Sequence, residues 1–308
     1  MRLVLAILAL TAAAPAAQAQ WQETYPVIRI GIIGGDNLAL ARMRAEPLRS
    51  YLADTLGVSV EVHAAADYGA LIADQLTGRY HATFLTASAF VAASAACDGC
   101  VQPLAVPTTA TGEPGYRAAL IVRGDSLIAD PDDLTGQRLA VSAEDSLAGR
   151  LLPLALFQAD GVDLTTFELV ERSNPAAAVQ ALADNADADV DGAVTRDADA
   201  ALGWVGLGDD PSARGVLSPM MIPNGITIDD ATVVWTSPMI PHGPFTVLVS
   251  LPSDLKADLA EAIVLLPETE YAASAGVSGG LAGGFTPINA DVFLPLSILV
   301  DPAFESPR

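Results

Sequence analysis

The stretch Val27-Ile28-Arg29-Ile30-Gly31-Ile32-Ile33, followed by Gly34-Gly35-Asp36, decides how the chain begins to fold. Its isoleucines and valine form a short apolar run, and the glycine pair ends it, which predicts a buried strand. Residues 38–56 then carry apolar side chains at helical spacing, which predicts a helix that Gly57 ends. A buried strand followed by an amphipathic helix is typical of an α/β fold.

The same alternation continues along the chain. It predicts further strands over residues 58–62, 82–85, 118–122, 138–141, 167–170, 190–194, 233–235 and 245–249. It predicts helices over 67–76 (capped by Asp67), 86–96, 147–158, 176–183 and 254–266, and a glycine-rich loop over 276–284. Strands that alternate with helices at this spacing form mostly parallel sheets.

The predicted elements form two similar βαβ halves. The chain leaves the first half over residues 116–123 and returns over 235–245, where Pro238, Pro241 and Pro244 favour stiff, extended backbone. Two crossings imply a hinge and a cleft between two lobes. We therefore expect lobe I to comprise residues 27–117 and 239–301, and lobe II to comprise residues 118–238.

The N-terminal residues have the layout of an export signal. Arg2 precedes the apolar residues 3–10, and a small, alanine-rich region then ends in Ala17-Gln18-Ala19. This layout predicts a signal peptide over residues 1–19 that is cleaved after Ala19. Pro15 and Gln18 interrupt the apolar run too early for a membrane anchor. We therefore expect a soluble, periplasmic mature protein.

The formal net charge of the 308-residue chain limits the classes of partner that it can bind. The chain has 15 Lys and Arg residues against 37 Asp and Glu residues, a formal net charge of −22. This excess of acid disfavours nucleic acid or an anionic membrane as a partner, because like charges repel. A small ligand responds to its local site, so the net charge does not exclude an anion.

Cys97 and Cys100 are separated by Asp98-Gly99, a strong turn dipeptide. In an oxidising compartment this spacing favours a local disulfide, with free thiols or a ligand contact as the alternatives. A zinc site is weaker, because neither His63 nor His81 lies at ligand spacing from the pair.

The sequence contains no convincing catalytic constellation. Residues 276–280 match G-x-S-x-G, but no predicted strand precedes them and the last histidine is His242. Asp187, Asp189 and Asp191 imitate the start of a calcium loop, although the twelfth position is Ala198. We predict no enzyme activity, metal or cofactor, and a secreted hydrolase is the weakest alternative.

Several short stretches, weak one by one, occur in the order and spacing of a known family. They are Ile28-Arg29-Ile30-Gly31, Glu46-Pro47-Leu48-Arg49 with Tyr51-Leu52, Asp67-Tyr68 with Ala70-Leu71, Phe84-Leu85, residues 116–123, Asp132-Asp133-Leu134-Thr135-Gly136, and Trp235-Thr236-Ser237-Pro238 with Ile240-Pro241. Over nearly the whole mature length, the chain resembles the periplasmic substrate-binding proteins of the phosphate/phosphite/phosphonate ABC-transporter family.

The resemblance implies a type II periplasmic binding protein. In that α/β fold each of two lobes has a mixed, mostly parallel sheet flanked by helices, and two hinge crossings join the lobes. It also implies capture of a small oxyanion between the lobes and delivery to an ABC permease in the inner membrane. We expect a monomer that binds a small molecule and no nucleic acid.

The chain departs from the family at positions that contact ligand there. Ala45 and Phe90 stand where the family has tyrosines, and Leu147 and Ala148 interrupt a Ser-Thr-Ser-Gly run. Thr195 stands near an acidic position of the family. Each lost hydrogen bond to a charged ligand would cost about 1.5–3 kcal/mol. The ligand's identity therefore stays open between phosphonate, phosphite, a phosphate-like oxyanion and a related polar solute.

The predicted cleft lies beyond the carboxyl ends of the strands, where helix N-termini favour an anion. Thr86, Ser88 and Ser146 are equally suited to capping helices, and His242 is equally suited to an exposed position. The expected ligand-binding residues are Asp36, Asn37, Thr86, Ser88, Phe90, Ser142, Ser146, Asn174, Thr195, Arg196 and His242.

An alternative role keeps the fold but changes the partner. Some relatives of the family are ligand sensors that signal to a membrane histidine kinase, including ones that bind arsenite. Trivalent arsenic prefers thiolates, which Cys97 and Cys100 would supply if reduced. Both lie at the far end of a predicted helix from Thr86, about 15 Å from the cleft at about 1.5 Å per residue.

Overall fold

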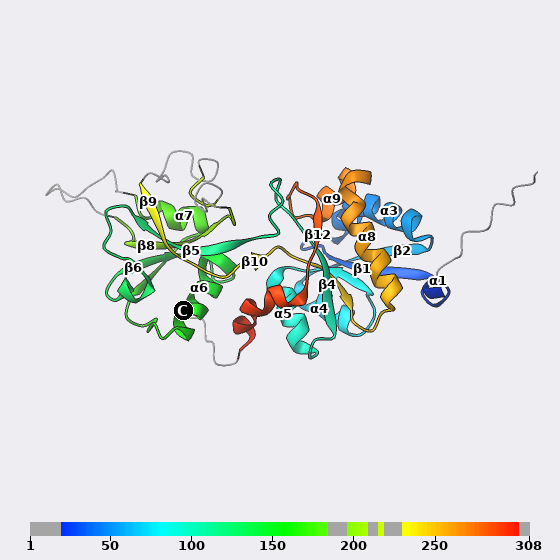
Figure 1. The fold of residues 1–308 in the computed structure, drawn as a ribbon, viewed down its shortest axis with the longest axis horizontal. Helices are drawn as coiled ribbons and strands as arrows, with labels where there is room; N and C mark the ends of the chain where they lie inside the picture. The colour runs from blue at the N-terminus through cyan, green and yellow to red at the C-terminus, as the bar shows by residue number, and fades with distance from the viewer. Residues whose placement is uncertain (1–19, 184–195, 209–214, 219–229, 302–308) are drawn as a thin grey trace, which may run out of the picture.

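The computed structural model describes residues 20–183, 196–208, 215–218 and 230–301. Within these residues two mixed sheets lie one after the other along the longest axis of the molecule, each flanked by helices (Figure 1). This arrangement confirms the predicted two-lobe α/β architecture. The predicted signal peptide, residues 1–19, and the predicted strand 190–194 fall outside the described residues.

The first sheet has the strand order β12-β4-β11-β3-β1-β2. Its strands are β1 (Val27–Ile33), β2 (Ser59–Ala65), β3 (Ala82–Phe84), β4 (Val101–Pro107), β11 (Phe245–Leu248) and β12 (Phe285–Pro287). Strand β1 runs parallel to β2 and β3, whereas β11 and β12 run antiparallel to β4. The buried residues of β1 pack with those of α3 and α8 in one core cluster, which includes Ile28, Leu52 and Leu259.

The helices of this lobe are α1 (Gln20–Thr24), α2 (Leu38–Arg44), α3 (Glu46–Leu56), α4 (Tyr68–Leu76), α5 (Ala87–Ala96), α8 (Ser253–Thr269) and α9 (Tyr271–Val277). The single helix predicted over 38–56 is wrong, because the chain breaks at Ala45 into α2 and α3. Pro47, in the first turn of α3, has no N–H with which to continue the hydrogen bonds of α2.

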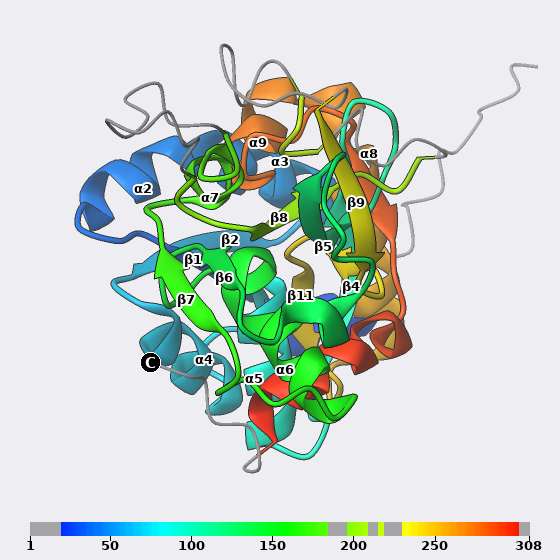
Figure 2. The same cartoon turned by 90° about the vertical axis from the view of Figure 1, so that its left-hand side faces the viewer.

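The second sheet has the strand order β10-β5-β8-β6-β7, and β9 pairs with β5. Its strands are β5 (Gly115–Arg123), β6 (Arg138–Val141), β7 (Glu168–Glu171), β8 (Ala200–Val205), β9 (Ala231–Thr236) and β10 (Ile240–Pro241). Its helices are η1 (Pro131–Leu134), η2 (Leu147–Leu151), α6 (Leu152–Ala159) and α7 (Pro175–Gln180). Figure 2 shows this sheet in front of the first one. Ile121 and Leu120 lie in different core clusters, so the sheet is buried on both faces.

The chain passes between the sheets from β4 to β5 and again from β10 to β11. The backbone N–H of His242 donates to the carbonyl of Pro114 at 2.9 Å and so ties the two passages together. The lobe boundaries 27–117, 118–238 and 239–301 stay a prediction.

A 3₁₀ helix, η4 (Ala290–Val300), lies where the two sheets with their helices meet (Figure 1). The ring of Phe293 lies 4.6 Å from that of Phe90 on α5, and Leu296 shares a core cluster with Leu152 on α6. One apolar core therefore continues from the helices of the first sheet to those of the second. No helix in the described part of the chain is long and apolar enough to cross a membrane.

Candidate functional site

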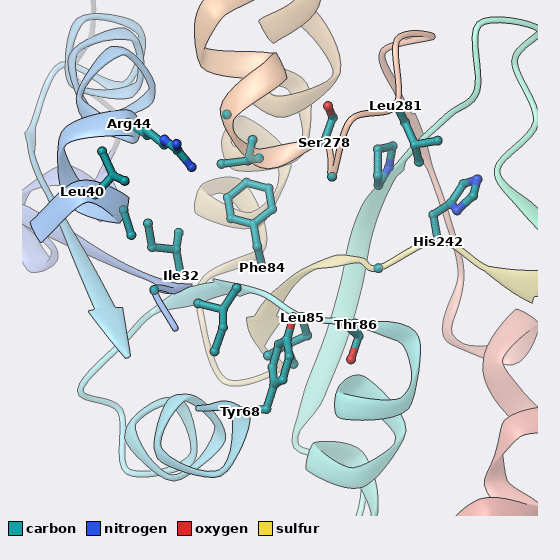
Figure 3. A pocket seen from close by; sticks show the side chains of 18 of the residues that line it. Ile32, Leu40, Arg44, Tyr68, Phe84, Leu85, Thr86, His242, Ser278 and Leu281 are labelled. Atoms are coloured by element: carbon teal, nitrogen blue, oxygen red, sulfur yellow. The ribbon is translucent and has the colours of Figure 1, made fainter. Parts of the chain in front are cut away.

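A cavity of about 660 Å³ lies at the carboxyl ends of β1 and β3. We call it the first cavity (Figure 3). Ile32 and Phe84, at the ends of these strands, form part of its wall, and Gly243 in the return passage closes one side. Since ligands of open α/β sheets bind beyond the carboxyl ends of the strands, this is the expected position for a ligand.

Helices α2, α4 and α5 all begin at the first cavity. Asn37 caps α2, its Oδ1 accepting from the N–H of Leu40 at 2.9 Å, and Thr86 caps α5, its Oγ1 accepting from Ala89 at 3.2 Å. Tyr68, the first residue of α4, lines the cavity with them. The first N–H groups of a helix have no partner within the helix, and they carry partial positive charge. Their convergence makes the first cavity suitable for an anion.

Arg44 supplies a full positive charge to the same cavity. Its side chain extends from the last turn of α2 toward the middle of the space (Figure 3). Within the described residues no hydrogen bond or ion pair holds its guanidinium group. Asp36, exposed at the start of α2, is an opposing charge on the cavity wall. Sequence reasoning missed Arg44, although Asn37, Leu40, Ala41 and Arg44 follow helical spacing and all four line the cavity.

Ser278 is a second cavity residue that sequence reasoning missed. It ends α9, and its hydroxyl is buried without a hydrogen-bond partner among the described residues. The residue lines the first cavity (Figure 3). The loop predicted from residue 276 begins later, because α9 continues to Val277. The G-x-S-x-G match thus places a serine beside a cavity, not on the strand-to-helix turn of a hydrolase.

A second cavity, of about 520 Å³, borders elements of the second sheet. Apolar and aromatic side chains form most of its wall: Tyr116, Leu147, Ala148, Pro175, Trp204 and Leu281. The rings of Tyr116 and Trp204 meet edge to face at a centroid distance of 6.1 Å. Burial raises the pKa of the Tyr116 hydroxyl.

Glu113 is the charged group in the second cavity. One of its oxygens accepts from the backbone N–H of Leu207 at 3.2 Å, and the other accepts from the hydroxyl of Thr111 at 3.3 Å and that of Thr109 at 3.4 Å. These hydrogen bonds hold the carboxylate in place. The second cavity therefore offers carboxylate oxygens held in place, whereas the first cavity has the guanidinium of Arg44 as well as the carboxylate of Asp36.

His242 and Leu281 line both cavities and so mark the place where they meet. Burial lowers the pKa of His242 to about 4, although the nearby carboxylate of Glu113 acts in the opposite direction. Its Nε2 is buried without a hydrogen-bond partner in the part of the chain that the structure describes. The ring lies 5.7 Å from that of Tyr116. A neutral imidazole thus stands between the cavities, with one buried polar atom that has no hydrogen-bond partner among the described residues.

The structure brings part of the predicted site together. Asp36, Asn37, Thr86 and His242 line the first cavity, and Ser146 lines the second, where it caps η2 by accepting from Gly149. Contact of these residues with a ligand stays a prediction.

Three predicted residues lie beside the cavities without lining them. Ser88 is in the first turn of α5, its hydroxyl 3.3 Å from that of Thr86. Ser142 is fully buried next to Gly149, and its hydroxyl has no partner among the described residues. Asn174 caps α7, whose first residue lines the second cavity.

Phe90 and Arg196 lie elsewhere, which corrects their predicted place in the cleft. Phe90 is 2% exposed and packs under Phe293 of η4, an element that the sequence analysis did not predict. Arg196 forms an ion pair with Asp125 at 3.7 Å, near the amino ends of β6 and β8 and so at the opposite edge of the sheet. Thr195 falls outside the described residues.

A disulfide joins Cys97 and Cys100 at the end of α5. Neither cysteine lines either cavity, whereas Thr86 at the start of the same helix lines the first cavity. In this form the pair offers no thiolate to an arsenite ion.

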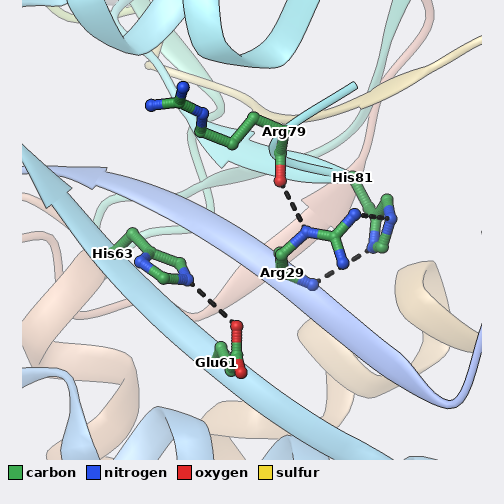
Figure 4. A network of polar contacts seen from close by, with 5 residues as sticks. All are labelled: Arg29, Glu61, His63, Arg79 and His81. Carbon is green, nitrogen blue, oxygen red and sulfur yellow. Dashed lines mark hydrogen bonds and ion pairs between the residues drawn. The ribbon is translucent and has the colours of Figure 1, made fainter. Parts of the chain in front are cut away.

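The other histidines take part in contacts on the first sheet (Figure 4). Nδ1 of His81 lies 3.1 Å from the backbone nitrogen of Arg29, and its Nε2 lies 3.0 Å from the Arg29 guanidinium. Burial, together with this guanidinium, lowers the pKa of His81 to about 4. His63 lies 3.2 Å from a carboxylate oxygen of Glu61. Neither histidine lines the two cavities, so neither can serve there as a catalytic base.

Solved structures share this fold. The similarity to XAC2383 from Xanthomonas citri bound to ATP has a TM-score of 0.59 at 15% identity, and it covers 91% of this chain and 100% of that one. The similarity to PhnD1 from Prochlorococcus marinus (MIT 9301) in complex with methylphosphonate has a TM-score of 0.51 at 14% identity, and it covers 89% of this chain and 97% of that one. At these identities the similarity establishes the fold alone.

The family is established by the sequence. Residues 38–293 match the model of the family described as ABC transporter, phosphonate, periplasmic substrate-binding protein. The match includes the helix starts, Arg44 and His242 of the first cavity, as well as the wall of the second cavity. The chain belongs to this family of periplasmic binding proteins, and it is the substrate-binding component of a phosphonate-type ABC transporter and not an enzyme.

Proposed function

We propose that the chain binds the oxyanion head of a phosphonate-type solute in the first cavity and encloses the solute between its lobes. The observation that carries this proposal is the convergence of α2, α4 and α5 on a cavity that also contains Arg44. Exposed N–H groups and a guanidinium together match a phosphonate, which offers several acceptor oxygens and negative charge. The net charge of −22 does not oppose binding, because short-range partners dominate inside a cleft.

The proposal gives roles to the helix starts, Arg44, Ser278 and His242. The backbone N–H groups after Asn37 and Thr86 donate to the oxyanion, and Arg44 neutralises it. The hydroxyl of Ser278 and the ring of His242 donate from the opposite wall. Closure of the lobes would bring η2, with Ser146 at its start, toward the same solute.

The remaining parts of the proposal concern where the protein acts. Residues 1–19 would direct export and be removed, which leaves a monomer in the periplasm. The closed, loaded protein would dock on a permease in the inner membrane. The lobe boundaries 27–117, 118–238 and 239–301 would then separate the two surfaces that approach each other on closure.

Isothermal titration calorimetry of the mature protein tests the ligand class. The panel contains phosphate, phosphite, methylphosphonate, arsenite and ATP, the last because XAC2383, which shares the fold, holds ATP. We expect phosphonate to bind and arsenite to give no heat. Binding of arsenite or ATP without binding of any phosphonate would contradict the proposal.

Arg44→Ala tests the site itself. We expect a loss of about tenfold or more in phosphonate affinity, because a hydrogen bond to a charged group contributes about 1.5–3 kcal/mol. Arg42→Ala is the matched control. Arg42 is on the same helix and exposed, it does not line the cavity, and its Nε donates to the carbonyl of Leu38 at 3.3 Å. Equal affinities of the two variants would place the anion elsewhere.

A further inference from the structure

The second cavity has the wrong chemistry for an oxyanion. Its wall includes the rings of Tyr116 and Trp204 and the side chains of Leu147 and Leu281. The carboxylate of Glu113, which accepts hydrogen bonds from Leu207 and two threonines, contributes acceptor oxygens, whereas a phosphonate group needs donors.

The start of η2 has the same apolar character. Leu147 and Ala148 both line the second cavity and carry no hydrogen-bonding group in their side chains. Ser146 keeps its hydroxyl, but it accepts the N–H of Gly149 at 3.3 Å. The second lobe therefore presents apolar surface at the place where a small phosphonate would need hydrogen-bond donors.

The two cavities are neighbours, because His242 and Leu281 line both of them. A ligand whose anionic head lies in the first cavity would reach the second by passing these two side chains. The volume of about 520 Å³ lies within the range of roughly 300–1,000 Å³ that is typical of sites for whole organic molecules. A methyl group would leave most of this apolar space unfilled.

We propose that the second cavity is a subsite for the organic substituent of the ligand, and that this substituent is bulky and apolar, with an aromatic ring as the best fit. The inference rests on the proposed function, since it assumes that a phosphonate head occupies the first cavity. The substituent packs against Trp204, Tyr116 and Leu147.

Calorimetric titration with methylphosphonate, 2-aminoethylphosphonate and benzylphosphonate tests the subsite. We expect benzylphosphonate to bind at least about tenfold more tightly than the other two, because burial of an apolar ring contributes more than burial of a methyl group. Its binding should also have the most negative heat-capacity change. Equal or tighter binding of methylphosphonate or 2-aminoethylphosphonate overturns the subsite while leaving the proposed function intact. Absence of binding by all three compounds overturns the proposed function and the subsite with it.

The substitution Leu147→Thr tests the contribution of one side chain to the subsite. It introduces a hydroxyl at the start of η2, so the ratio of benzylphosphonate affinity to methylphosphonate affinity should fall several-fold. Leu151→Thr is the matched control, because Leu151 is also in η2 and half-buried but does not line the cavity. A ratio that changes equally in both variants, or in neither, contradicts the subsite. Melting temperatures of both variants report whether the lobe stays folded.

Discussion

The two cavities share His242 in their linings, but the chemistry of their walls differs. The first is surrounded by the starts of α2, α4 and α5 and contains the guanidinium of Arg44. The second is lined by the rings of Tyr116 and Trp204 and contains a carboxylate. Under the proposed function, the first cavity would hold the charged head of the ligand and the second would hold its substituent.

The difference also explains how a protein of net charge −22 can bind an anion. The acid excess is spread over the whole chain, whereas the polarity of each cavity depends on a few nearby groups. In the first cavity those groups are helix starts, Arg44 and Asp36, and in the second they are aromatic rings and Glu113. The local arrangement, and not the sum of charges, decides which end of a ligand enters which cavity.

The largest effect is expected from glycine substitutions that compare the walls of the cavities. A Cβ at Gly243 would collide with the backbone carbonyl of Leu85, directly before the start of α5. A backbone atom cannot rotate away, so Gly243→Ala should destabilise the protein by about 3 kcal/mol and greatly weaken phosphonate binding. Chemical denaturation and calorimetric titration measure the two effects.

Gly149→Ala is the counterpart near the second cavity. There a Cβ would meet the hydroxyl groups of Ser142 and Ser146, which can rotate, and the Cβ of Ser142 at 2.8 Å, which cannot. Because the nearest contact is a side-chain atom and not a backbone carbonyl, we expect a somewhat smaller loss of about 2 kcal/mol. Gly124→Ala is the control, since its nearest neighbour, the carbonyl of Asp230, lies at an ordinary 3.8 Å. If Gly149→Ala destabilised the protein more than Gly243→Ala, the close contact with the backbone carbonyl of Leu85 would not be the costlier of the two.

An intermediate effect is expected from pH, because His242 stands between the cavities. Its pKa of about 4 in the free protein lies below the ordinary value of 6.5. A bound anion would stabilise the imidazolium and raise this pKa, so binding takes up a proton. The affinity for phosphonate should therefore increase as pH falls from 7 to 5, by about tenfold for each unit of pKa shift expressed in that window.

His242→Gln separates this effect from titration of the phosphonate itself. The variant should keep only the ligand's own pH dependence, and an identical profile in both proteins would show that His242 does not contact the anion. Stability without ligand should change in the opposite sense. A depressed folded pKa contributes stability above pH 6.5, and that contribution is lost as pH falls toward 4. Chemical denaturation at several pH values measures it.

The fold could be predicted where the local signal was strong. Short runs of residues determine the strand Val27–Ile33, the capping of α4 by Asp67 and the alternation of strands with helices. Strand β8 was not predicted, although residues 200–205 are largely apolar. A strand was predicted instead at residues 190–194, within the aspartate-rich segment before it. The break at Ala45 was missed because apolar periodicity continues across it.

The lining of the first cavity could be predicted only where a residue follows a strand or lies in the return passage. Asn37 and Thr86 are of the first kind and His242 is of the second; all three line the cavity, and their contact with a ligand stays a prediction. Arg44 lies on the last turn of its helix, and Ser278 comes from a segment more than 200 residues further along the chain. Phe90 was misplaced because its surroundings depend on η4, which covers it from the far end of the chain. Long-range packing of this kind leaves no local pattern.

The smallest effect on binding is expected at the disulfide, which tests whether the first cavity needs only the start of α5. Cys97 and Cys100 close a very short loop at the opposite end of that helix from Thr86. Replacing both by serine should cost about 1–2 kcal/mol of stability, since a short loop gains little from closure. Phosphonate affinity should stay within about twofold of the unchanged protein, because the N–H groups at the start of α5 keep their positions. A loss of affinity comparable to that of Arg44→Ala would mean that the whole helix is held by its end, and the anion site would then extend beyond the wall of the first cavity.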